Sequence, residues 1–284
     1  MQNGAHQPRS LGAHTPRLGE QGLPVPALCC GFGRRAGVDH SPPSLAGRRL
    51  QQISNNLMVV RMLAMNNRAL KDLLYEQVAR VGKALSSPKR LEILEMLAQG
   101  EKAVETITAV VGIDNKLASA HLKALKEASL VQTRREGKRI YYSLSGCDVS
   151  QLTVNLRCVA ESHLVELRMA LQGMAAQPER MVRVDRKTLM AQARRGEVVV
   201  IDVRPPDEYL AAHLPYARSM PLAELTQRLA ELPRDVDIVA YCRGPFCLMS
   251  DEAVKLLQAH GLRARKTSDG ICEWQAAGLP LATH

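Results

Sequence analysis

The residue with the clearest chemistry is Cys242, which lies in the stretch YCRGPFC at residues 241–247. Residues 236–241 are apolar and β-branched, which predicts a buried strand, and residues 248–258 have helical apolar spacing. A cysteine on a tight loop between a strand and a helix N-terminus faces unpaired backbone N–H groups and the positive end of the helix dipole, which favour a thiolate. Arg243 adds positive charge. We therefore predict a nucleophilic Cys242 with a low pKa; the alternative is a buried structural cysteine.

Three segments in order resemble the signatures of the rhodanese family of sulfurtransferases. Residues 199–222 look like its first signature, the Cys242 loop follows, and residues 269–281 look like its C-terminal signature, so the match covers about residues 180–282. The resemblance implies an α/β domain with a central parallel sheet and transfer of sulfane sulfur through a Cys242 persulfide. Loop amides would hold the sulfur, and Asp202 would maintain the loop architecture. The loop residues concerned are Arg243, Gly244, Phe246 and Cys247.

Cys247 departs from the pattern of this family. Single-domain rhodaneses often have arginine at the sixth loop position, where it helps to bind the anionic donor. Thiosulfate binding is then either weaker or dependent on Arg243. A thiol five residues from the first could also attack a Cys242 persulfide or sulfenic acid and close a disulfide. The other interpretation is that Cys247 only packs under the helix.

The charge and cysteine content limit the class of protein. The net charge of +10 is concentrated in the first two thirds of the chain, with +5 in residues 1–65, +4 in residues 66–175 and only +1 in residues 176–284. A basic surface away from the sulfur chemistry suggests nucleic acid as a partner. Seven scattered cysteines do not form the framework of a small secreted module, and no apolar run is long enough to span a membrane. We expect a cytoplasmic protein without a cofactor.

The composition divides the chain into four segments. Residues 1–65 are rich in Gly, Pro, Ser and Arg without periodicity, so we expect a disordered or mis-assigned N-terminal extension. Residues 66–175 have helical and then strand-like patterns, residues 176–180 read as a linker, and residues 181–284 form the rhodanese-like segment. In that last segment we predict helices at residues 185–195 and 221–232 and a strand at residues 198–202.

Residues 66–144 have the pattern of a helix-turn-helix with a basic hairpin. Apolar spacing predicts helices at residues 70–85, 91–97 and 104–111, and a fourth that is capped by Asp114 or Asn115 and runs to about residue 128. On the fourth helix Lys116, Ala120 and Lys123 point outward, with Ser119 on the flank, which suits a major groove. Residues 130–133 and 139–144 have the alternating polar and apolar pattern of strands on either side of a basic tip. This pattern predicts a wing that contacts DNA phosphates.

This segment resembles the ArsR/SmtB family of winged-helix repressors over about residues 68–172. Residues 85–94, 121–131 and 134–142 carry the resemblance. It implies a homodimer, joined through the first and last helices, that binds an inverted repeat in double-stranded DNA; the alternative is a dimerisation module that does not bind an operator. The candidate DNA-binding residues are Asn115, Lys116, Ser119, Ala120, His121, Lys123, Arg134, Arg135, Lys138 and Arg139.

A metal site is not expected. Several members of the family place a cysteine pair at the start of the third helix, where this chain has Ala103 and Val104. Cys147 and Cys158 remain, the second on a long helix predicted from Val149 to Met174, and a pair eleven residues apart makes a weak thiolate site.

The sequence therefore predicts two domains, a winged helix-turn-helix and an α/β rhodanese-like domain. The favoured function is a transcriptional regulator whose Cys242 takes sulfane sulfur from a donor such as thiosulfate, with sulfurtransferase activity in the C-terminal domain. The alternatives are a thiosulfate sulfurtransferase that uses the winged helix mainly to dimerise, and a metal-responsive repressor.

Overall fold

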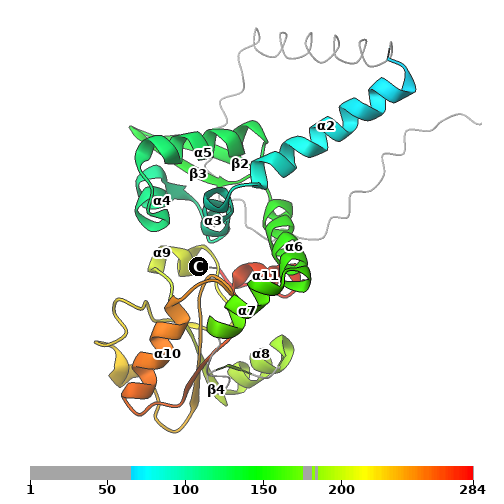
Figure 1. Cartoon of the computed structure of the whole chain (residues 1–284). Helices are drawn as coiled ribbons and strands as arrows, with labels where there is room; N and C mark the ends of the chain where they lie inside the picture. The colour runs from blue at the N-terminus through cyan, green and yellow to red at the C-terminus, as the bar shows by residue number, and fades with distance from the viewer. Residues whose placement is uncertain (1–64, 175–180, 183–184, 284) are drawn as a thin grey trace, which may run out of the picture.

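The computed structural model describes residues 65–174, 181–182 and 185–283, which form two parts (Figure 1). The first part is a winged helix. Its elements are α2 (Asn67–Leu85), α3 (Pro88–Leu97), β1 (Lys102–Ala103), α4 (Val104–Val111), α5 (Asn115–Glu127), β2 (Val131–Glu136) and β3 (Arg139–Leu144).

The turn between α4 and α5 is set by two residues. Gly112 ends α4 with a φ of 65°, in the left-handed region that favours glycine. Asp114 caps α5, because its side chain accepts a hydrogen bond of 2.8 Å from the Leu117 N–H. Of the two predicted caps it is thus Asp114 that serves, and Asn115 is the first residue of the helix. The predicted inner face of α5 is buried, namely Ala118, Leu122 and Leu125.

The wing is a hairpin in which β2 and β3 pair antiparallel, with Glu136 opposite Arg139 at its tip. The two-residue strand β1 adds to the other edge of β3, where Lys102 lies opposite Tyr142. Lys102 therefore lies in the same sheet as the wing.

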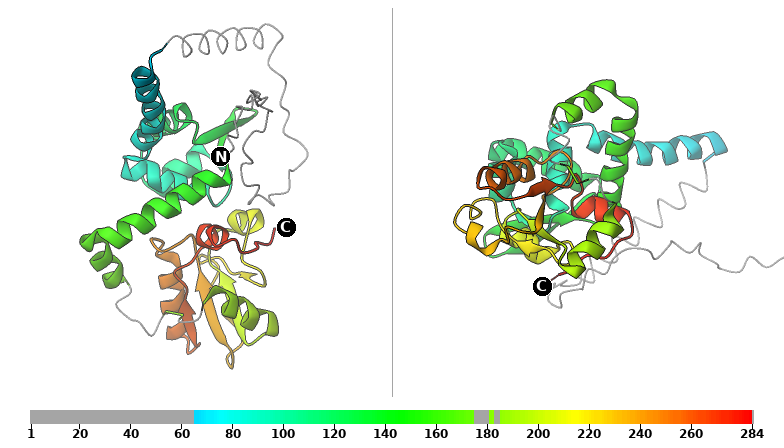
Figure 2. Two further views of the ribbon diagram at one scale, coloured as in Figure 1. Left: turned by 90° about the vertical axis from the view of Figure 1, so that its right-hand side faces the viewer. Right: turned by 90° about the horizontal axis from the view of Figure 1, so that it is seen from below.

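The predicted helix from Val149 to Met174 is wrong as a single element. Instead, α6 (Cys147–His163) ends at Leu164, whose extended backbone (φ −99°, ψ 112°) separates it from α7 (Val165–Met174). The Arg168 side chain donates a hydrogen bond of 2.8 Å to the Ser162 carbonyl, one of the acceptors left without an intrahelical partner at the end of α6. We count α6 and α7 with the winged-helix part, and in Figures 1 and 2 α6 lies on the side of that part that faces the second part.

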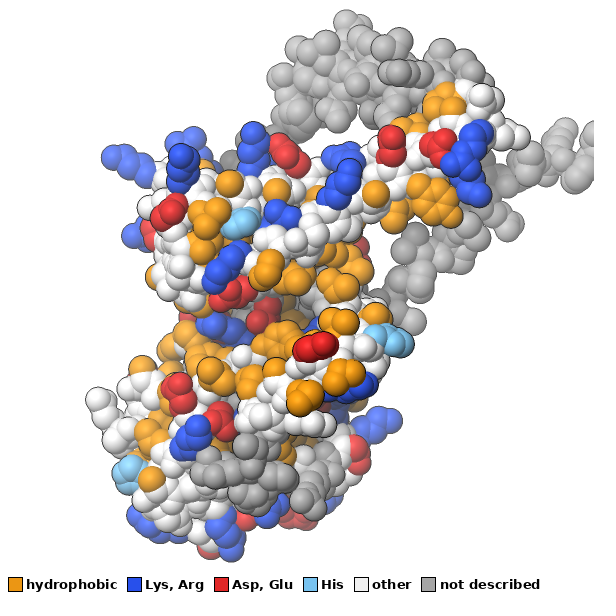
Figure 3. Space-filling model, viewed as in Figure 1, with side chains coloured by type: hydrophobic (Ala, Val, Ile, Leu, Met, Phe, Trp, Pro, Cys, Tyr) orange, Lys and Arg blue, Asp and Glu red, His pale blue; other side chains and the backbone are white. Residues whose placement is uncertain are grey.

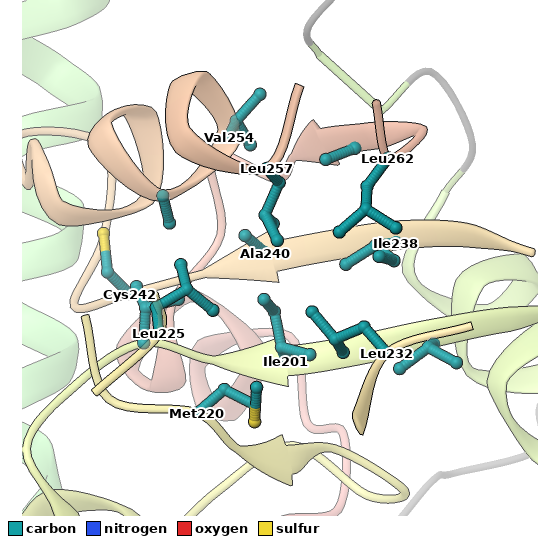
Figure 4. Packing of buried hydrophobic residues seen from close by; sticks show 14 residues of the cluster. Ile201, Met220, Leu225, Leu232, Ile238, Ala240, Cys242, Val254, Leu257 and Leu262 are labelled. Carbon is teal, nitrogen blue, oxygen red and sulfur yellow. The ribbon is translucent and has the colours of Figure 1, made fainter. Parts of the chain in front are cut away.

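The second part has a parallel sheet in the order β5-β4-β6-β7. One face packs on α10 and the other on α8 and α11, so the sheet is covered on both sides. Figure 4 shows the first face, where Cys242 lies at the end of β6. The elements are α8 (Arg186–Arg195), β4 (Val198–Asp202), α9 (Pro206–Ala211), β5 (Arg218–Ser219), β6 (Asp237–Tyr241), α10 (Met249–Ala259), β7 (Ala264–Lys266) and α11 (Ile271–Ala276). This arrangement confirms the predicted fold class.

Residues 221–232 do not form the predicted helix. The segment is a series of turns that ends in a short 3₁₀ helix, Leu229–Glu231. Its backbone bonds run mainly between residues three apart, as from the Glu224 N–H to Pro221 and from the Leu232 N–H to Leu229. The apolar residues Leu225 and Leu232 are nevertheless buried, so helical spacing in the sequence reported their burial and not the backbone conformation.

Candidate functional site

Cys242 follows the last residue of β6 and is buried, with 2% of its surface exposed. Its Sγ lies 3.2 Å from the Ser250 hydroxyl, in the first turn of α10, and 3.5 Å from the Cys247 carbonyl oxygen. The Cys loop, residues 242–248, thus folds around the sulfur as the rhodanese resemblance implies.

The pKa of Cys242 is lowered from 9.0 to about 6. The main cause is a hydrogen bond from the Cys247 thiol, opposed by burial and assisted by the Ser250 hydroxyl and by the amides of Ser250 and Gly244. Conversely, the adjacent thiolate and burial raise the pKa of Cys247. The lowered pKa agrees in direction with the predicted thiolate, which stays a prediction, and a neighbouring thiol is its largest stabiliser. Ser250 is not among the predicted site residues, although its position in the first turn of the helix after the Cys loop could have indicated it.

Asp202 fixes the strand that leads into the Cys loop. Its fully buried carboxylate accepts hydrogen bonds of 2.5 Å from the Tyr241 hydroxyl and 2.5 Å from Arg204 Nη2. Tyr241 immediately precedes Cys242, so this network determines where β6 ends.

Arg243 forms an ion pair with an acid of α9. Its guanidinium group donates hydrogen bonds of 2.7 and 3.0 Å to the carboxylate of Glu208, which is 1% exposed. The bidentate pair holds the loop against α9. In the structure this guanidinium group supports the loop, and the alternative that Arg243 also binds the donor stays a prediction.

Glu273 and Gly270 support the other side of the Cys loop. Gly270 has no room for a side chain, since a Cβ there would lie 2.3 Å from the Arg243 carbonyl oxygen. Glu273 accepts a hydrogen bond of 2.7 Å from the Gly270 N–H, and its carboxylate lies 3.3 Å from the position that a Cβ on Gly244 would occupy. A side chain at Gly270 would therefore displace the loop, and one at Gly244 would press on the Glu273 carboxylate.

Both acids that support the loop are bound by cations of the winged-helix part. Lys102 Nζ lies 3.4 Å from Glu208 and 2.5 Å from Asp207, and Arg157 of α6 lies 2.6 Å from Glu273. The Arg157 guanidinium group also lies 5.7 Å from the ring centre of Phe246, in the Cys loop. A third contact joins Arg204 to the buried Gln99 side chain at 2.8 Å. The two parts are thus connected by contacts that end at the sulfur site.

A cavity of about 320 Å³ opens beside the Cys loop, and we call it the sulfur-site cavity. Gly244, Pro245 and Cys247 line one side of it, while Arg157 and Cys158 of α6 line another. Its volume suits a small sulfur donor. The nearby cations are already paired, Arg186 with Asp269 at 2.6 Å and Lys266 with Asp251 at 3.2 Å.

The helix α5, which carries six of the candidate DNA-binding residues, lies at the end of the winged helix away from the second part (Figure 1). On α5, Lys116, Ser119, Ala120 and Lys123 are exposed together with Asn115, and His121 is half-buried. Figure 3 shows lysine and arginine side chains along this edge. The exposed wing residues are Arg135, Lys138 and Arg139.

Arg134 differs from the other basic residues of the wing. Its guanidinium group lies 2.6 Å from Glu101 and 2.7 Å from Glu136, and stacks over the Tyr141 ring at 4.7 Å. Two acids already compensate its charge, which leaves Arg135, Lys138 and Arg139 as the accessible cations of the tip.

The described residues contain no cluster of three or more His, Cys, Asp or Glu side chains that could hold a metal ion. Over the same residues, no helix has the length and apolar character needed to cross a bilayer.

The fold and the Cys loop together define a winged-helix regulator joined to a rhodanese-like domain, and comparisons with known proteins agree. The bacterial regulatory protein, arsR family, model matches residues 87–133, and the rhodanese-like domain model matches residues 185–277. The HTH-type transcriptional regulator Rv0324 of Mycobacterium tuberculosis is 46% identical over 211 residues, which is 74% of this chain and 92% of that protein. The chain therefore belongs to the ArsR family of DNA-binding transcriptional regulators, with a rhodanese-like domain after the winged helix.

Two further proteins resemble one part each. A sulfurtransferase of Allochromatium vinosum is 32% identical over 85 residues, 30% of this chain and 78% of that protein. The solution structure of the homodimeric winged helix-turn-helix domain Mb0332 of Mycobacterium bovis is 48% identical, with a TM-score of 0.33; it covers 36% of this chain and 94% of that structure.

Proposed function

We propose that this regulator takes up sulfane sulfur on Cys242 and that the resulting persulfide changes the affinity of the winged helix for its operator. The observation that carries the proposal is the location of a thiol with a pKa of about 6 in a loop whose two supporting acids are bound by Lys102 and Arg157 of the DNA-binding part. A chemical change at the sulfur is then close to groups that both parts share.

The first step is nucleophilic displacement on the donor. The Cys242 thiolate attacks the outer sulfur of thiosulfate, the sulfur–sulfur bond of thiosulfate breaks, and sulfite leaves with its electron pair. The product is a Cys242 persulfide anion, which the surrounding amides and the Ser250 hydroxyl stabilise as they do the thiolate. A cyanide ion can then remove the outer sulfur as thiocyanate and restore the thiolate.

The Cys242 persulfide can also react with Cys247. Its thiol lies beside Cys242, and attack on the inner sulfur would release hydrogen sulfide and leave a Cys242–Cys247 disulfide. The raised pKa of Cys247 keeps this thiol protonated, which slows the attack.

DNA binding in this proposal uses a homodimer and an inverted repeat. Exposed apolar side chains support the dimer, because α2 presents Leu74, Tyr75 and Val78 at 54–70% exposure and α6 presents Val159 at 58%. Lys116 and Lys123 of each α5 would enter the major groove, and Arg135, Lys138 and Arg139 would contact phosphates.

Mass spectrometry after exposure of the full chain to thiosulfate tests the first step. The expected result is one additional sulfur atom on the peptide that contains Cys242, and none after Cys242→Ser substitution. A disulfide-linked peptide containing Cys247 and Cys242 would support the reaction of the persulfide with Cys247. Sulfur found only on another cysteine would contradict the assignment.

A further inference from the structure

A second cavity, of about 510 Å³, lies between the two parts of the protein, and we call it the interdomain cavity. Its walls come from α3, α6 and α7 on one side and from the Cys loop and α11 on the other. Arg157 and Glu273 line both this cavity and the sulfur-site cavity, so their ion pair lies between the two. Pockets of this size at domain junctions are typical sites for small molecules.

Most of the lining is apolar. Leu91 of α3, Val154 of α6, Leu167 of α7 and Phe246 of the Cys loop contribute hydrocarbon surface. Figure 3 shows hydrophobic side chains in the hollow between the two parts, with acidic and basic side chains among them. A molecule bound here must therefore be largely apolar, and the polar groups of the lining determine which charge it must have.

The charges of the cavity leave one carboxylate uncompensated. Arg157 pairs with Glu273 at 2.6 Å, and Arg243 pairs with Glu208 at 2.7 Å. Glu92, at the rim, pairs with Lys89 at 3.0 Å. Over the described part of the chain, the Glu95 carboxylate has no hydrogen bond or ion pair with another side chain.

Burial raises the pKa of Glu95 to about 7. The charged groups that face it act in opposite directions: Arg157 and Arg243 lower its pKa, and Glu273 and Cys242 raise it. Burial therefore remains the largest influence on the pKa of Glu95. Glu95 is partly buried. A carboxylate in such a place without a partner is costly, and an opposite charge placed beside it recovers part of that cost.

We propose that the interdomain cavity binds a small, mainly apolar molecule that carries a protonated amine, with its ammonium group on the Glu95 carboxylate and its hydrocarbon against Leu91, Val154 and Phe246. An anion is disfavoured because both arginines are already paired. A neutral molecule would bury Glu95 further without compensation. The site is separate from the sulfur chemistry and would give the regulator a second input, since its walls belong to both parts of the protein.

The fluorescence of Trp274 can report ligand binding in the interdomain cavity. It is the sole tryptophan of the chain, is buried in α11, and follows Cys272 and Glu273 of the cavity wall. The full-length protein is titrated at about pH 8 with phenethylamine, phenethyl alcohol and hydrocinnamate, three probes of similar shape and different charge. Tryptophan fluorescence reports occupancy, and calorimetry provides a second readout of binding.

The expected result is that the amine binds at least about tenfold more tightly than either other probe. Its affinity should also rise about tenfold between about pH 6 and pH 8, because the carboxyl group ionises in this range while the amine stays protonated. Glu95→Gln should remove both the preference and the pH dependence. Glu105→Gln, an exposed change on α4, is the matched control and should leave both unchanged.

Four results would overturn the proposal. Three of them are the absence of calorimetric binding by the amine at millimolar concentration, equal affinity for all three probes, and tightest binding of hydrocinnamate, which would mean that the arginines dominate. A preference for the amine that survives in Glu95→Gln would also assign the charge recognition to another residue and contradict it.

Discussion

Lys102 Nζ lies 3.4 Å from the carboxylate of Glu208, although the two residues belong to different parts of the protein. Both side chains are nearly inaccessible to solvent, at 4% and 1% exposure. Lys102 is paired with a strand of the wing sheet, and Glu208 holds Arg243 beside Cys242. The contact therefore connects the sheet of the wing to the Cys loop through three charged residues.

Replacement of Lys102 by methionine should weaken this connection. Glu208 would keep only Arg243 as its cation, and removal of one member of a buried ion pair leaves the other charge poorly compensated. We expect the free energy of unfolding to fall by about 2 kcal/mol and the effect of thiosulfate on DNA affinity to be lost. Denaturant titration and DNA-binding curves measure the two effects.

Lys187→Met is the matched control, since Lys187 is exposed on α8. It should leave both quantities unchanged. If Lys102→Met retains the full response of DNA binding to thiosulfate, this contact does not couple the two parts.

The reactivity of Cys242 should follow a pKa of about 6. The alkylation rate of this thiol is expected to rise with pH to a half-maximum near that value and to level off above it, because only the thiolate reacts. Ser250→Ala should move the half-maximum to higher pH, and Cys247→Ala should move it further, in the order of their contributions. Ser162→Ala, on exposed α6 surface, should not move it. A half-maximum close to 9.0 in the unmodified protein would contradict the thiolate assignment.

The basic residues of the wing should contribute unequally to DNA affinity. Arg135→Ala and Lys138→Ala are each expected to weaken binding and to reduce the slope of log affinity against log salt by about 1, as for one lost phosphate contact. Arg134→Ala should change the slope less, because Glu101 and Glu136 already pair with it. Anisotropy titrations over a range of salt concentrations, with DNA from upstream of the gene, make the comparison. A larger effect of Arg134→Ala than of the other two would show that its ion pairs open on DNA.

The proposed dimer should depend on the exposed apolar face of α2. Val78 is 70% exposed there, and Val78→Asp would place a charge in the interface. We expect sedimentation to show a monomer for this variant at concentrations where the unmodified protein is a dimer. Glu76→Gln on the same helix is the control. A monomeric unmodified protein would refute the dimer directly.

The sequence was informative where chemistry depends on local order. The strand, the Cys loop and the helix around Cys242 follow one another, so their signals could be read directly, and the buried face of α5 followed from residue spacing. Helical spacing was misleading at residues 221–232, where buried side chains recur but the backbone forms turns. It also could not detect the break at Leu164, since one extended residue hardly changes an apolar pattern.

The contacts between the parts could not be predicted. Lys102 and Glu208 are more than a hundred residues apart, as are Arg157 and Glu273, and each reads as ordinary surface charge in the sequence. Glu95 is not among the residues singled out from the sequence, because the interdomain cavity forms only where α6 and the Cys loop pack near it. The sequence indicated only a short linker between the winged helix and the domain that contains Cys242.

The central claim is that sulfur on Cys242 alters DNA binding, and the affinity of the full-length protein for operator DNA before and after thiosulfate treatment tests it most directly. The account predicts a change of about fivefold or more in the dissociation constant, reversed by cyanide and absent in Cys242→Ser. Cys147→Ser is the control and should respond as the unmodified protein does. An unchanged affinity in a protein shown to carry sulfur on Cys242 would contradict the claim.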